Sequence, residues 1–155
     1  RIDRVQNPGL YREYHKSKQE LSKKYNGYPN EQLLKYGTRT TDPKNIWNSG
    51  KDTNTFGFDP RFCEKGLFGK GAYFSEDTSY SHLQAYCIPN STNKQMFLAS
   101  VLVGSPDQKN ATDPNIRHPT PPHDSVRGPI TTSNQVIVIY EIHRSYPTYL
   151  VTYRK

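Results

Sequence analysis

The sequence predicts an α+β domain built on antiparallel sheets with flanking helices, and three observations indicate this class. A pattern typical of an amphipathic helix comes first, and strand-like runs dominate the second half of the chain. The connections between those runs are long, irregular and rich in Gly, Pro, Asp and Asn, which favours this class over a repeating βαβ arrangement. A chain of 155 residues is expected to form one domain with a modest core.

The first helix is expected to begin after Asn7 and to end at Gly27. Asn is a favoured N-cap residue, and Pro8 takes the first helical position, where its missing N–H costs nothing. A mostly apolar stripe then recurs at intervals of three and four residues, at Tyr11, Tyr14, Lys18, Leu21 and Tyr25. The stripe predicts packing against a sheet rather than chemistry.

Short apolar runs and the positions of Gly and Pro predict the remaining elements. A strand at residues 33–36 runs into Gly37, and a second helix extends from Asp42-Pro43 to Gly50. The run at residues 95–104 is apolar enough to be a central strand buried on both faces. Two further strands are expected at residues 135–142 and 146–153, and long loops that are functional or mobile at residues 50–66 and 105–128.

Composition limits the classes of function. The chain is 32 % hydrophobic but has 12 Tyr, so amphipathic rings must form much of the core. Its formal charge of +7 suits anionic ligands such as nucleotides or nucleic acid, and equally suits an ordinary basic surface. No stretch reads as a membrane span or a signal peptide, so we expect an intracellular protein, cytoplasmic or nuclear, without a membrane partner. Because the chain begins at Arg1, we expect it to be a fragment of a longer protein.

The cysteines and histidines predict no metal site. Cys63 and Cys87 are too few and too far apart for a metal-ligand spacing, and the 5 His show no paired spacing. A disulfide between the two cysteines stays open at this point. A chain with few cysteines and no secretion signal nevertheless favours free thiols.

The segment from Phe68 to Tyr86 is predicted to form one wall of a ligand pocket. Gly69 and Gly71 allow a close approach of the backbone, and a short aromatic strand follows them at residues 72–74.

A helix is expected next, with Ser75 as its N-cap and two acidic residues in its first turn. It would present Ser81 at its far end, so that Tyr73, Tyr86 and this hydroxyl could face one flat ring. Core packing of the two tyrosines explains the same pattern and, from the residues alone, is the simpler explanation.

Seven blocks of residues carry a resemblance to a known family: Leu34–Thr38, Gly57–Asp59, Phe68–Phe74, Tyr80-Ser81, Met96–Ala99 with Val101–Gly104, Pro121-Pro122 with Asp124–Val126, and Tyr146–Tyr153. Their order resembles that in the catalytic domain of the poly(ADP-ribose) polymerase (PARP) family, and the likeness covers nearly the whole chain. Residues 2–14 are similar to the lead-in helix of the mono-ADP-ribosylating branch. The resemblance implies a PARP-type ADP-ribosyltransferase fold for residues 1–155, without the helical regulatory domain of the DNA-damage-activated members.

The resemblance also implies a reaction, the transfer of ADP-ribose from NAD⁺ to a protein side chain with loss of nicotinamide. The transition state resembles an oxocarbenium ion. Nicotinamide and both riboses must therefore be held, and the positive charge that grows on the sugar must be stabilised by negative charge or by an incoming nucleophile. By resemblance, the loop at residues 58–68 would cover the dinucleotide and the loop at residues 105–128 would border the acceptor. The connection between Gly50 and Gly57 is longer than is usual in the family. The role of residues 58–68 as a covering loop therefore does not follow from the resemblance alone.

Four residues would bind the nicotinamide group by resemblance. The backbone N–H and C=O of Gly37 and the hydroxyl of Ser81 would hold its carboxamide. Tyr73 and Tyr86 would sandwich its ring, and the spacing from Ser81 to Tyr86 is similar to that of the mono-transferase branch.

The chain departs from the family's catalytic His-Tyr-Glu triad, because the corresponding residues are Tyr36, Tyr73 and Val136. Valine has no charge to hold a ribose hydroxyl or to stabilise an oxocarbenium ion, so elongation to a polymer should be absent. Transfer of a single unit would still be feasible if the acceptor's own carboxylate assists. Tyr36 would lie where the adenosine ribose belongs, so weakened or blocked NAD⁺ binding is expected unless another rotamer leaves the pocket open.

Two functions therefore remain open. The first is a slow protein mono-ADP-ribosyltransferase, and the second is a catalytically inactive pseudo-enzyme that serves as an interaction module for protein or nucleic acid. The resemblance extends to pseudo-enzyme members, one of which has Tyr before its strand turn. Protein acceptors or protein partners are expected, the domain is expected to be a monomer, and nucleic acid would be bound through flanking domains because no RNA-binding block is present.

Overall fold

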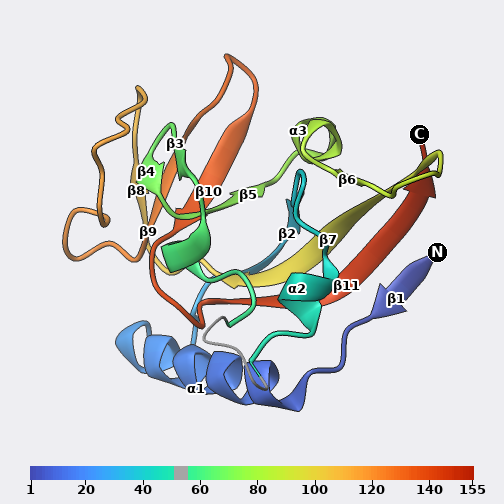
Figure 1. Ribbon diagram of the computed structural model, residues 1–155. Helices are drawn as coiled ribbons and strands as arrows, with labels where there is room; N and C mark the ends of the chain where they lie inside the picture. The colour runs from blue at the N-terminus through green and yellow to red at the C-terminus, as the bar shows by residue number, and fades with distance from the viewer. Residues whose placement is uncertain (51–55) are drawn as a thin grey trace.

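One nine-stranded sheet organises residues 1–50 and 56–155, the part of the chain that this computed structural model describes (Figure 1). The elements are β1 (Ile2–Arg4), α1 (Pro8–Lys24), β2 (Glu31–Tyr36), α2 (Lys44–Trp47), the 3-10 helix η1 (Pro60–Phe62), β3 (Lys65–Gly66), β4 (Gly69–Lys70), β5 (Ala72–Ser75), α3 (Thr78–Leu83), β6 (Tyr86–Cys87), β7 (Asn93–Leu102), β8 (Pro106–Gln108), β9 (Ser125–Pro129), β10 (Gln135–Ile139) and β11 (Ser145–Arg154). The predicted α+β class is confirmed.

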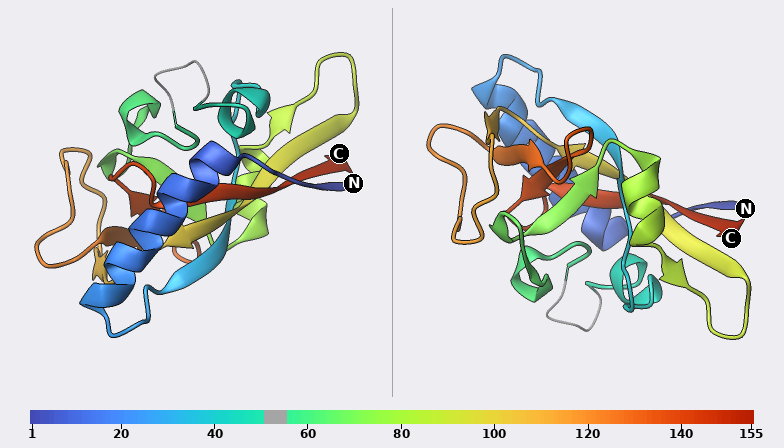
Figure 2. Two further views of the ribbon diagram at one scale, coloured as in Figure 1. Left: turned by 90° about the horizontal axis from the view of Figure 1, so that it is seen from below. Right: turned by 90° about the horizontal axis from the view of Figure 1, so that it is seen from above.

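The strands lie in the order β1-β11-β7-β2-β5-β10-β9-β8, and β6 pairs with β7 beside them. The pairings within this sheet are antiparallel, as predicted, except for β8 and β9 at one edge, which are parallel. Strand β1 pairs with β11, which brings the two ends of the described chain to one side of the molecule (Figure 2). Among the described residues, no helix is both long and apolar enough to cross a bilayer.

The two halves of the sheet meet at the end of β2. This strand pairs with β7 along its whole length but with β5 through a single pair, Lys35 opposite Ser75. Tyr36 and Gly37 follow that junction directly, so their backbone leaves the ladder at the point where the two halves meet. The candidate site forms here.

Strand β7 is the predicted central strand, with β11 on one side and β2 and β6 on the other. Phe97, Ala99 and Val101 are fully buried, and they belong to the main apolar cluster of the domain. Leu98 and Ser100 are only half-buried, so the expectation of burial on both faces fails for the middle of the strand.

Helix α1 lies across one face of the long strands β7 and β11 (Figure 2). Three buried residues of the helix, Leu10, Tyr14 and Leu21, form a cluster with Leu102 and Tyr146 of those strands. The predicted packing is confirmed at Tyr14 and Leu21, whereas Tyr11 of the predicted stripe is 53 % exposed. The helix ends at Lys24 rather than at the predicted Gly27. Gly27 instead takes a left-handed conformation, with φ of 93°, and donates its N–H to the carbonyl of Ser22 at 2.7 Å.

Asn7 caps α1 as predicted and also holds the segment after α2. Its Oδ1 accepts from Leu10 N at 3.1 Å, while Nδ2 donates to the carbonyls of Trp47 at 3.0 Å and Ser49 at 2.9 Å. The residue is 4 % exposed, so water cannot easily replace these partners.

The replacement Asn7→Ala is expected to lower the free energy of unfolding by about 2–3 kcal/mol, because it removes the cap and leaves two buried carbonyls without donors. Urea unfolding of the natural domain and the variant measures this difference. Asn7→Asp keeps the cap acceptor but loses both donors, so it should show a loss as well; an Asp variant as stable as the natural domain would contradict the role of the two carbonyl contacts.

Several predicted boundaries differ from the structure. The second helix is confined to Lys44–Trp47 instead of reaching from Asp42 to Gly50. Residues 51–55, which fall in the predicted long connection, lie outside the described residues. The predicted loop at residues 105–128 contains β8 and most of β9. These two strands are short and largely polar, so their sequences show no strand pattern.

The N-cap of α3 is Asp77 rather than the predicted Ser75. Asp77 Oδ1 accepts from the N–H of Ser79 at 2.6 Å. Ser75 is instead the last residue of β5, where it pairs with Val136 and Lys35. Pairing across the junction therefore overrides a local capping preference.

Candidate functional site

A cavity of about 870 Å³ opens beside the end of β2. Its walls come from the segment after β2, from the region of α2, from residues 57–67, from β5 and from α3. The volume lies within the range of about 300–1,000 Å³ that small-molecule sites usually have. These elements are far apart in the sequence, and the junction of the two half-sheets brings them together.

Gly37 packs directly against the end of α3. A Cβ at this position would overlap the carbonyl group of Gln84 and lie 2.7 Å from the Cβ of Gln84, so a larger residue does not fit. The N–H of Arg39 donates to that same carbonyl at 2.8 Å. Ser81 lies on the same helix one turn before Gln84, is 2 % exposed and lines the cavity. The strand end and the helix end therefore form one wall.

Three polar groups of this wall have no hydrogen-bond partner among residues 1–50 and 56–155: the N–H of Gly37, its C=O, and the hydroxyl of Ser81. Because Gly37 and Ser81 line the cavity, this donor, acceptor and hydroxyl are available to a polar ligand there. A carboxamide, which has one carbonyl and one NH₂ group, is complementary to this set.

Tyr73, on β5, is held in one orientation by the turn between β3 and β4. Its hydroxyl donates to the carbonyl of Gly69 at 2.6 Å and accepts from the N–H of Phe68 at 2.8 Å. Gly66 makes room for the ring, since a Cβ there would lie 2.7 Å from Cζ of Tyr73. Burial raises the pKa of Tyr73, so the phenol stays protonated at neutral pH. The ring is a rigid part of the cavity wall.

Tyr36 directs its ring into an aromatic cluster beside the cavity. The ring centroid lies 4.6 Å from that of Phe58 and 5.3 Å from that of Phe74. Burial, followed by the neighbouring Cys63 thiol, raises the pKa of Tyr36 well above its usual range. Burial likewise raises the pKa of Cys63 to about 11. Both groups are therefore uncharged at neutral pH, and the phenol fills space at the junction.

Two of the predicted site residues do not line the cavity. Tyr86 lies on β6, opposite Gln95 of β7, and Val136 is fully buried. Val136 belongs to an apolar cluster against which Tyr73 and Tyr80 pack. The structure thus brings Tyr36, Gly37, Tyr73 and Ser81 to one cavity, while the sandwich of a ring between Tyr73 and Tyr86 stays a prediction.

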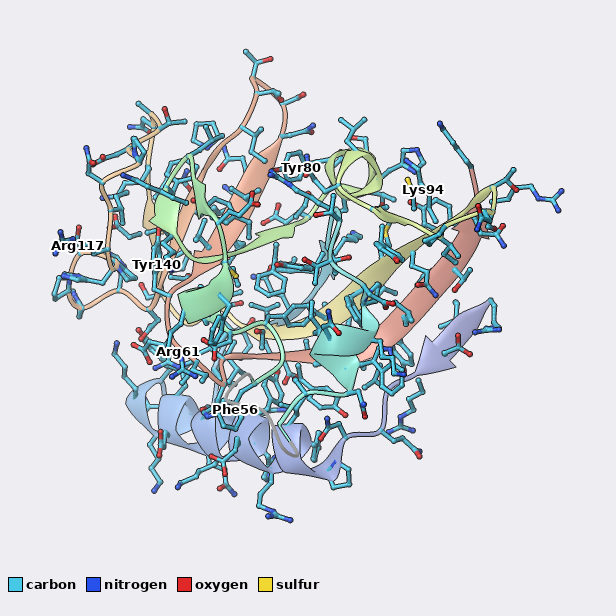
Figure 3. The ribbon with its side chains drawn as sticks, in the orientation of Figure 1. Phe56, Arg61, Tyr80, Lys94, Arg117 and Tyr140 are labelled. Atoms are coloured by element: carbon cyan, nitrogen blue, oxygen red, sulfur yellow. The ribbon has the colours of Figure 1, made fainter. Side chains whose placement is uncertain are left out.

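Sequence reasoning missed several residues of the cavity. Tyr80 of α3, labelled in Figure 3, packs against the apolar cluster that includes residues of β10 and lines the cavity together with Gln84. Residues three and four apart share a helix face, so Ser81 alone could have pointed to Gln84, and Gln84 in turn to Tyr80.

Arg39 connects the two sides of the cavity. It is the second residue after Gly37 and has a left-handed backbone, with φ of 55°. Its Nε donates to Oε1 of Gln84, the C-cap residue of α3, and its Nη1 donates at 3.2 Å to Oε2 of Glu64 on the opposite loop. The guanidinium therefore joins the α3 wall to the loop at residues 57–67.

The described part of the chain contains neither a disulfide bond nor a cluster of metal-ligand side chains. Cys63 and Cys87 are both free thiols. No three His, Cys, Asp or Glu side chains within residues 1–50 and 56–155 lie close enough to hold a metal ion.

The chain belongs to the poly(ADP-ribose) polymerase family, because residues 1–137 match the family's catalytic domain. It is 35 % identical over its whole length to a probable poly [ADP-ribose] polymerase of Dictyostelium discoideum, covering 44 % of that protein. It is also 28 % identical to the human protein mono-ADP-ribosyltransferase PARP14, again over its whole length, covering 9 % of that protein. Mouse protein mono-ADP-ribosyltransferase PARP12 is 32 % identical over 99 % of the chain, which spans 21 % of it.

These comparisons confirm the predicted resemblance to the mono-ADP-ribosylating branch. The chain spans less than half the length of each of these relatives. Members of the family use NAD as substrate, so the cavity can be compared with the needs of a dinucleotide. Gly37, Ser81 and the ring of Tyr36 all line this cavity.

Proposed function

We propose that this domain transfers single ADP-ribose units from NAD⁺ to protein side chains, slowly and without elongation to a polymer. The observation that carries the proposal is the set of unpaired polar groups on Gly37 and Ser81 beside the fixed ring of Tyr73 in one cavity. Membership of a family with mono-ADP-ribosyltransferase relatives supports it.

In this proposal, the chain's own residues act by binding and orienting nicotinamide. The Gly37 N–H and the Ser81 hydroxyl donate to the carboxamide oxygen, and the Gly37 carbonyl accepts from its NH₂ group. The ring of Tyr73 stacks on the pyridinium, with Tyr86 as the proposed second face. A leaving group held in one orientation lowers the entropic part of the barrier to breaking the glycosidic bond.

Val136 would supply no charge to the reacting sugar, since its side chain is apolar and fully buried. The acceptor's carboxylate would fill that role by attacking C1′ of the nicotinamide ribose. A bond then forms between the carboxylate oxygen and C1′, the bond from C1′ to nitrogen breaks, and its electron pair leaves with neutral nicotinamide. Without a carboxylate to activate a ribose hydroxyl, the reaction would stop after one unit.

A second candidate function is a non-catalytic interaction module, and the packing of Tyr36 favours it. The ring lies against Phe58 and Phe74 at the point where the family's histidine would hold the adenosine ribose. If this packing is fixed, the dinucleotide cannot enter in its bent form, and the cavity would serve a protein partner instead.

Calorimetric titration with NAD⁺ of the natural domain and of Tyr36→His tests the proposal. The natural domain is expected to bind weakly and saturably, and the variant at least about tenfold more tightly, a gain of about 1.4 kcal/mol. Tyr36→Phe is the matched control, because it keeps the ring and adds no donor; it should gain nothing. Transfer from labelled NAD⁺ to a Glu-rich peptide then measures activity.

The outcomes separate the two functions. No binding by the natural domain, together with binding by Tyr36→His, would overturn the transferase proposal and favour the interaction module. Equal gains for Tyr36→His and Tyr36→Phe would mean that the phenol oxygen, rather than the ring, obstructs the ribose.

A further inference from the structure

The sheet face that α1 covers continues beyond the helix. Leu102 of β7 lies in the cluster under α1, and residues two apart on a strand share a face, so Ser100 and Leu98 belong to this face too. Leu33 of β2 pairs with Ser100 and is 51 % exposed. Helix α1 crosses the face at one end, and beyond it β7 and β11 continue toward the ends of the described chain (Figure 2). The part of the face beyond α1 therefore reaches solvent.

One row of side chains crosses four strands in this open part. Arg4 of β1 lies opposite Tyr149 of β11, Tyr149 lies opposite Leu98 of β7, and Leu98 lies opposite Lys35 of β2. Residues directly opposite each other in an antiparallel pair stand on the same face of the sheet. The row therefore has a cation at each end, with an aromatic ring and an aliphatic side chain between them.

The two rows beside it are apolar, aromatic or basic. Tyr153 stands on the same face of β11 as Tyr149, about 14 Å further along the strand. The side chains of these two rows, in order across the strands, are Ile2, Val151 and Met96, followed by Tyr153 and Lys94. Ile2 is 65 % exposed. The three rows together form a basic surface that carries two tyrosine rings and several apolar side chains.

The cations of the three rows have no carboxylate partner in the described part of the chain. Arg4 is exposed, and its side chain makes neither a hydrogen bond nor an ion pair with residues 1–50 or 56–155. Lys35 Nζ donates to the carbonyl of Glu76 at 2.7 Å, and Lys94 Nζ donates to the carbonyl of His82 at 3.3 Å. No Asp or Glu belongs to the rows. Their positive charge is therefore not neutralised locally, which suits a polyanion.

We propose that the three rows bind single-stranded nucleic acid. Arg4 and Lys35 pair with phosphates, and the ring of Tyr149 stacks on a base. Tyr153 offers a second ring to the same strand. Stacking accepts any base, so the sequence preference is weak. A duplex keeps its bases stacked inside, so it binds less well than a single strand.

This site is separate from the cavity. Tyr36 follows Lys35 on β2, and neighbouring residues of a strand point to opposite faces, so the rows lie on the face away from the aromatic cluster of Tyr36. The residues of the rows come from four strands, and no contiguous basic or aromatic block marks them in the sequence. Loss of the proposed transferase function would leave this binding unchanged.

The electrostatic part of the proposal is tested by the salt dependence of binding. Fluorescence anisotropy with labelled oligouridylate should show saturable binding by the natural domain. Two neutralised phosphates on a single strand give a slope of about −1.4 for the logarithm of affinity against the logarithm of salt concentration. Arg4→Gln should reduce the size of this slope by about 0.7. Arg12→Gln removes the same charge from the exposed side of α1 and is the matched control, which should leave the slope unchanged.

The stacking part is tested at Tyr149. Tyr149→Ala should weaken binding at least about tenfold, whereas Tyr149→Phe keeps the ring and should bind as the natural domain does. Tyr11→Ala removes an exposed tyrosine from α1 and should also bind as the natural domain does. Urea unfolding of each variant shows that it is folded, and the exposed Arg4 provides a test that does not depend on the packing of Tyr149.

Several results would overturn the proposal. The natural domain could fail to bind oligouridylate, or Arg4→Gln and Tyr149→Ala could bind as tightly as the natural domain. Equal competition by duplex RNA would exclude stacking as the source of affinity. Equal competition by polyglutamate would assign the rows to an acidic protein segment instead. A dimer in sedimentation that Tyr149→Ala dissociates would mean that a second copy of the chain covers the rows.

Discussion

Gly37→Ala is expected to destroy the wall that Gly37 forms with the end of α3. The added Cβ would overlap the carbonyl group of Gln84, so the helix end must move and the hydrogen bond from Arg39 to that carbonyl must break. Overpacking of this kind costs about 1–3 kcal/mol, which urea unfolding measures. In the Tyr36→His background, NAD⁺ affinity should also fall by at least about tenfold in calorimetry, since the groups that would hold the carboxamide lose their spacing.

Gly9→Ala is the matched control for this substitution. A Cβ at Gly9 meets nothing closer than Asn7 Oδ1 at 3.6 Å, which is an ordinary contact, and Ala favours the helix in which it lies. This variant should be at least as stable as the natural domain. If Gly37→Ala were equally stable and bound NAD⁺ as the parent does, the close contact between Gly37 and Gln84 would not be a determinant of the site.

The elements with long, regular patterns were predictable from the sequence. The start of α1 is predictable from local structure, because the Asn7 side chain caps the helix and Pro8 suits its first position. The apolar runs of β7, β10 and β11 are long enough to predict strands without knowledge of the neighbouring segments. A shared pocket for Tyr73 and Ser81 was predictable from the segment that contains them. The position of Gly37 in the same cavity was predictable only through the resemblance to a family, because the spacing along the chain does not show that β2 and α3 are in contact.

The remaining features depend on contacts between distant segments. Strands β3, β4 and β6 have two residues each, too few for a pattern, and exist because a neighbouring segment supplies the partner. The bridge from Gln84 through Arg39 to Glu64 joins three segments and needs a left-handed arginine, which local preferences disfavour. Such a residue is recognisable only once the fold is known.

Asp124→Asn is expected to lower the free energy of unfolding by about 2–4 kcal/mol at neutral pH. The Asp124 side chain is 6 % exposed, and it accepts from Lys24 Nζ at 2.8 Å, from the N–H of Ser105 at 2.9 Å and from the hydroxyl of Tyr25. It also lies 3.8 Å from Nη1 of Arg144, a buried nitrogen without a hydrogen bond. An amide in this place cannot accept from all three donors and leaves the guanidinium with less compensating charge.

The effect of Asp124→Asn should depend on pH in a defined direction. Burial alone raises the pKa of Asp124, but the hydrogen bonds from Lys24, Ser105 and Tyr25 outweigh it, so the pKa in the folded state is lowered. The unfolded chain then binds this proton more readily, with a pKa of about 3.9. The stabilisation is fully present above the unfolded pKa and is lost as the pH falls through that value to the folded one.

Urea unfolding of the natural domain and Asp124→Asn at pH 7, 5 and 3.5 should therefore show the largest difference at the two higher values and a smaller one at the lowest. Glu76→Gln removes an exposed ion pair with Arg127 and should cost less than about 1 kcal/mol. A difference for Asp124→Asn that stays constant down to pH 3.5 would mean that the charge of Asp124 contributes nothing. The loss would then come from shape and neutral hydrogen bonding alone, and the segments that Asp124 joins would not be held together by its ionised carboxylate.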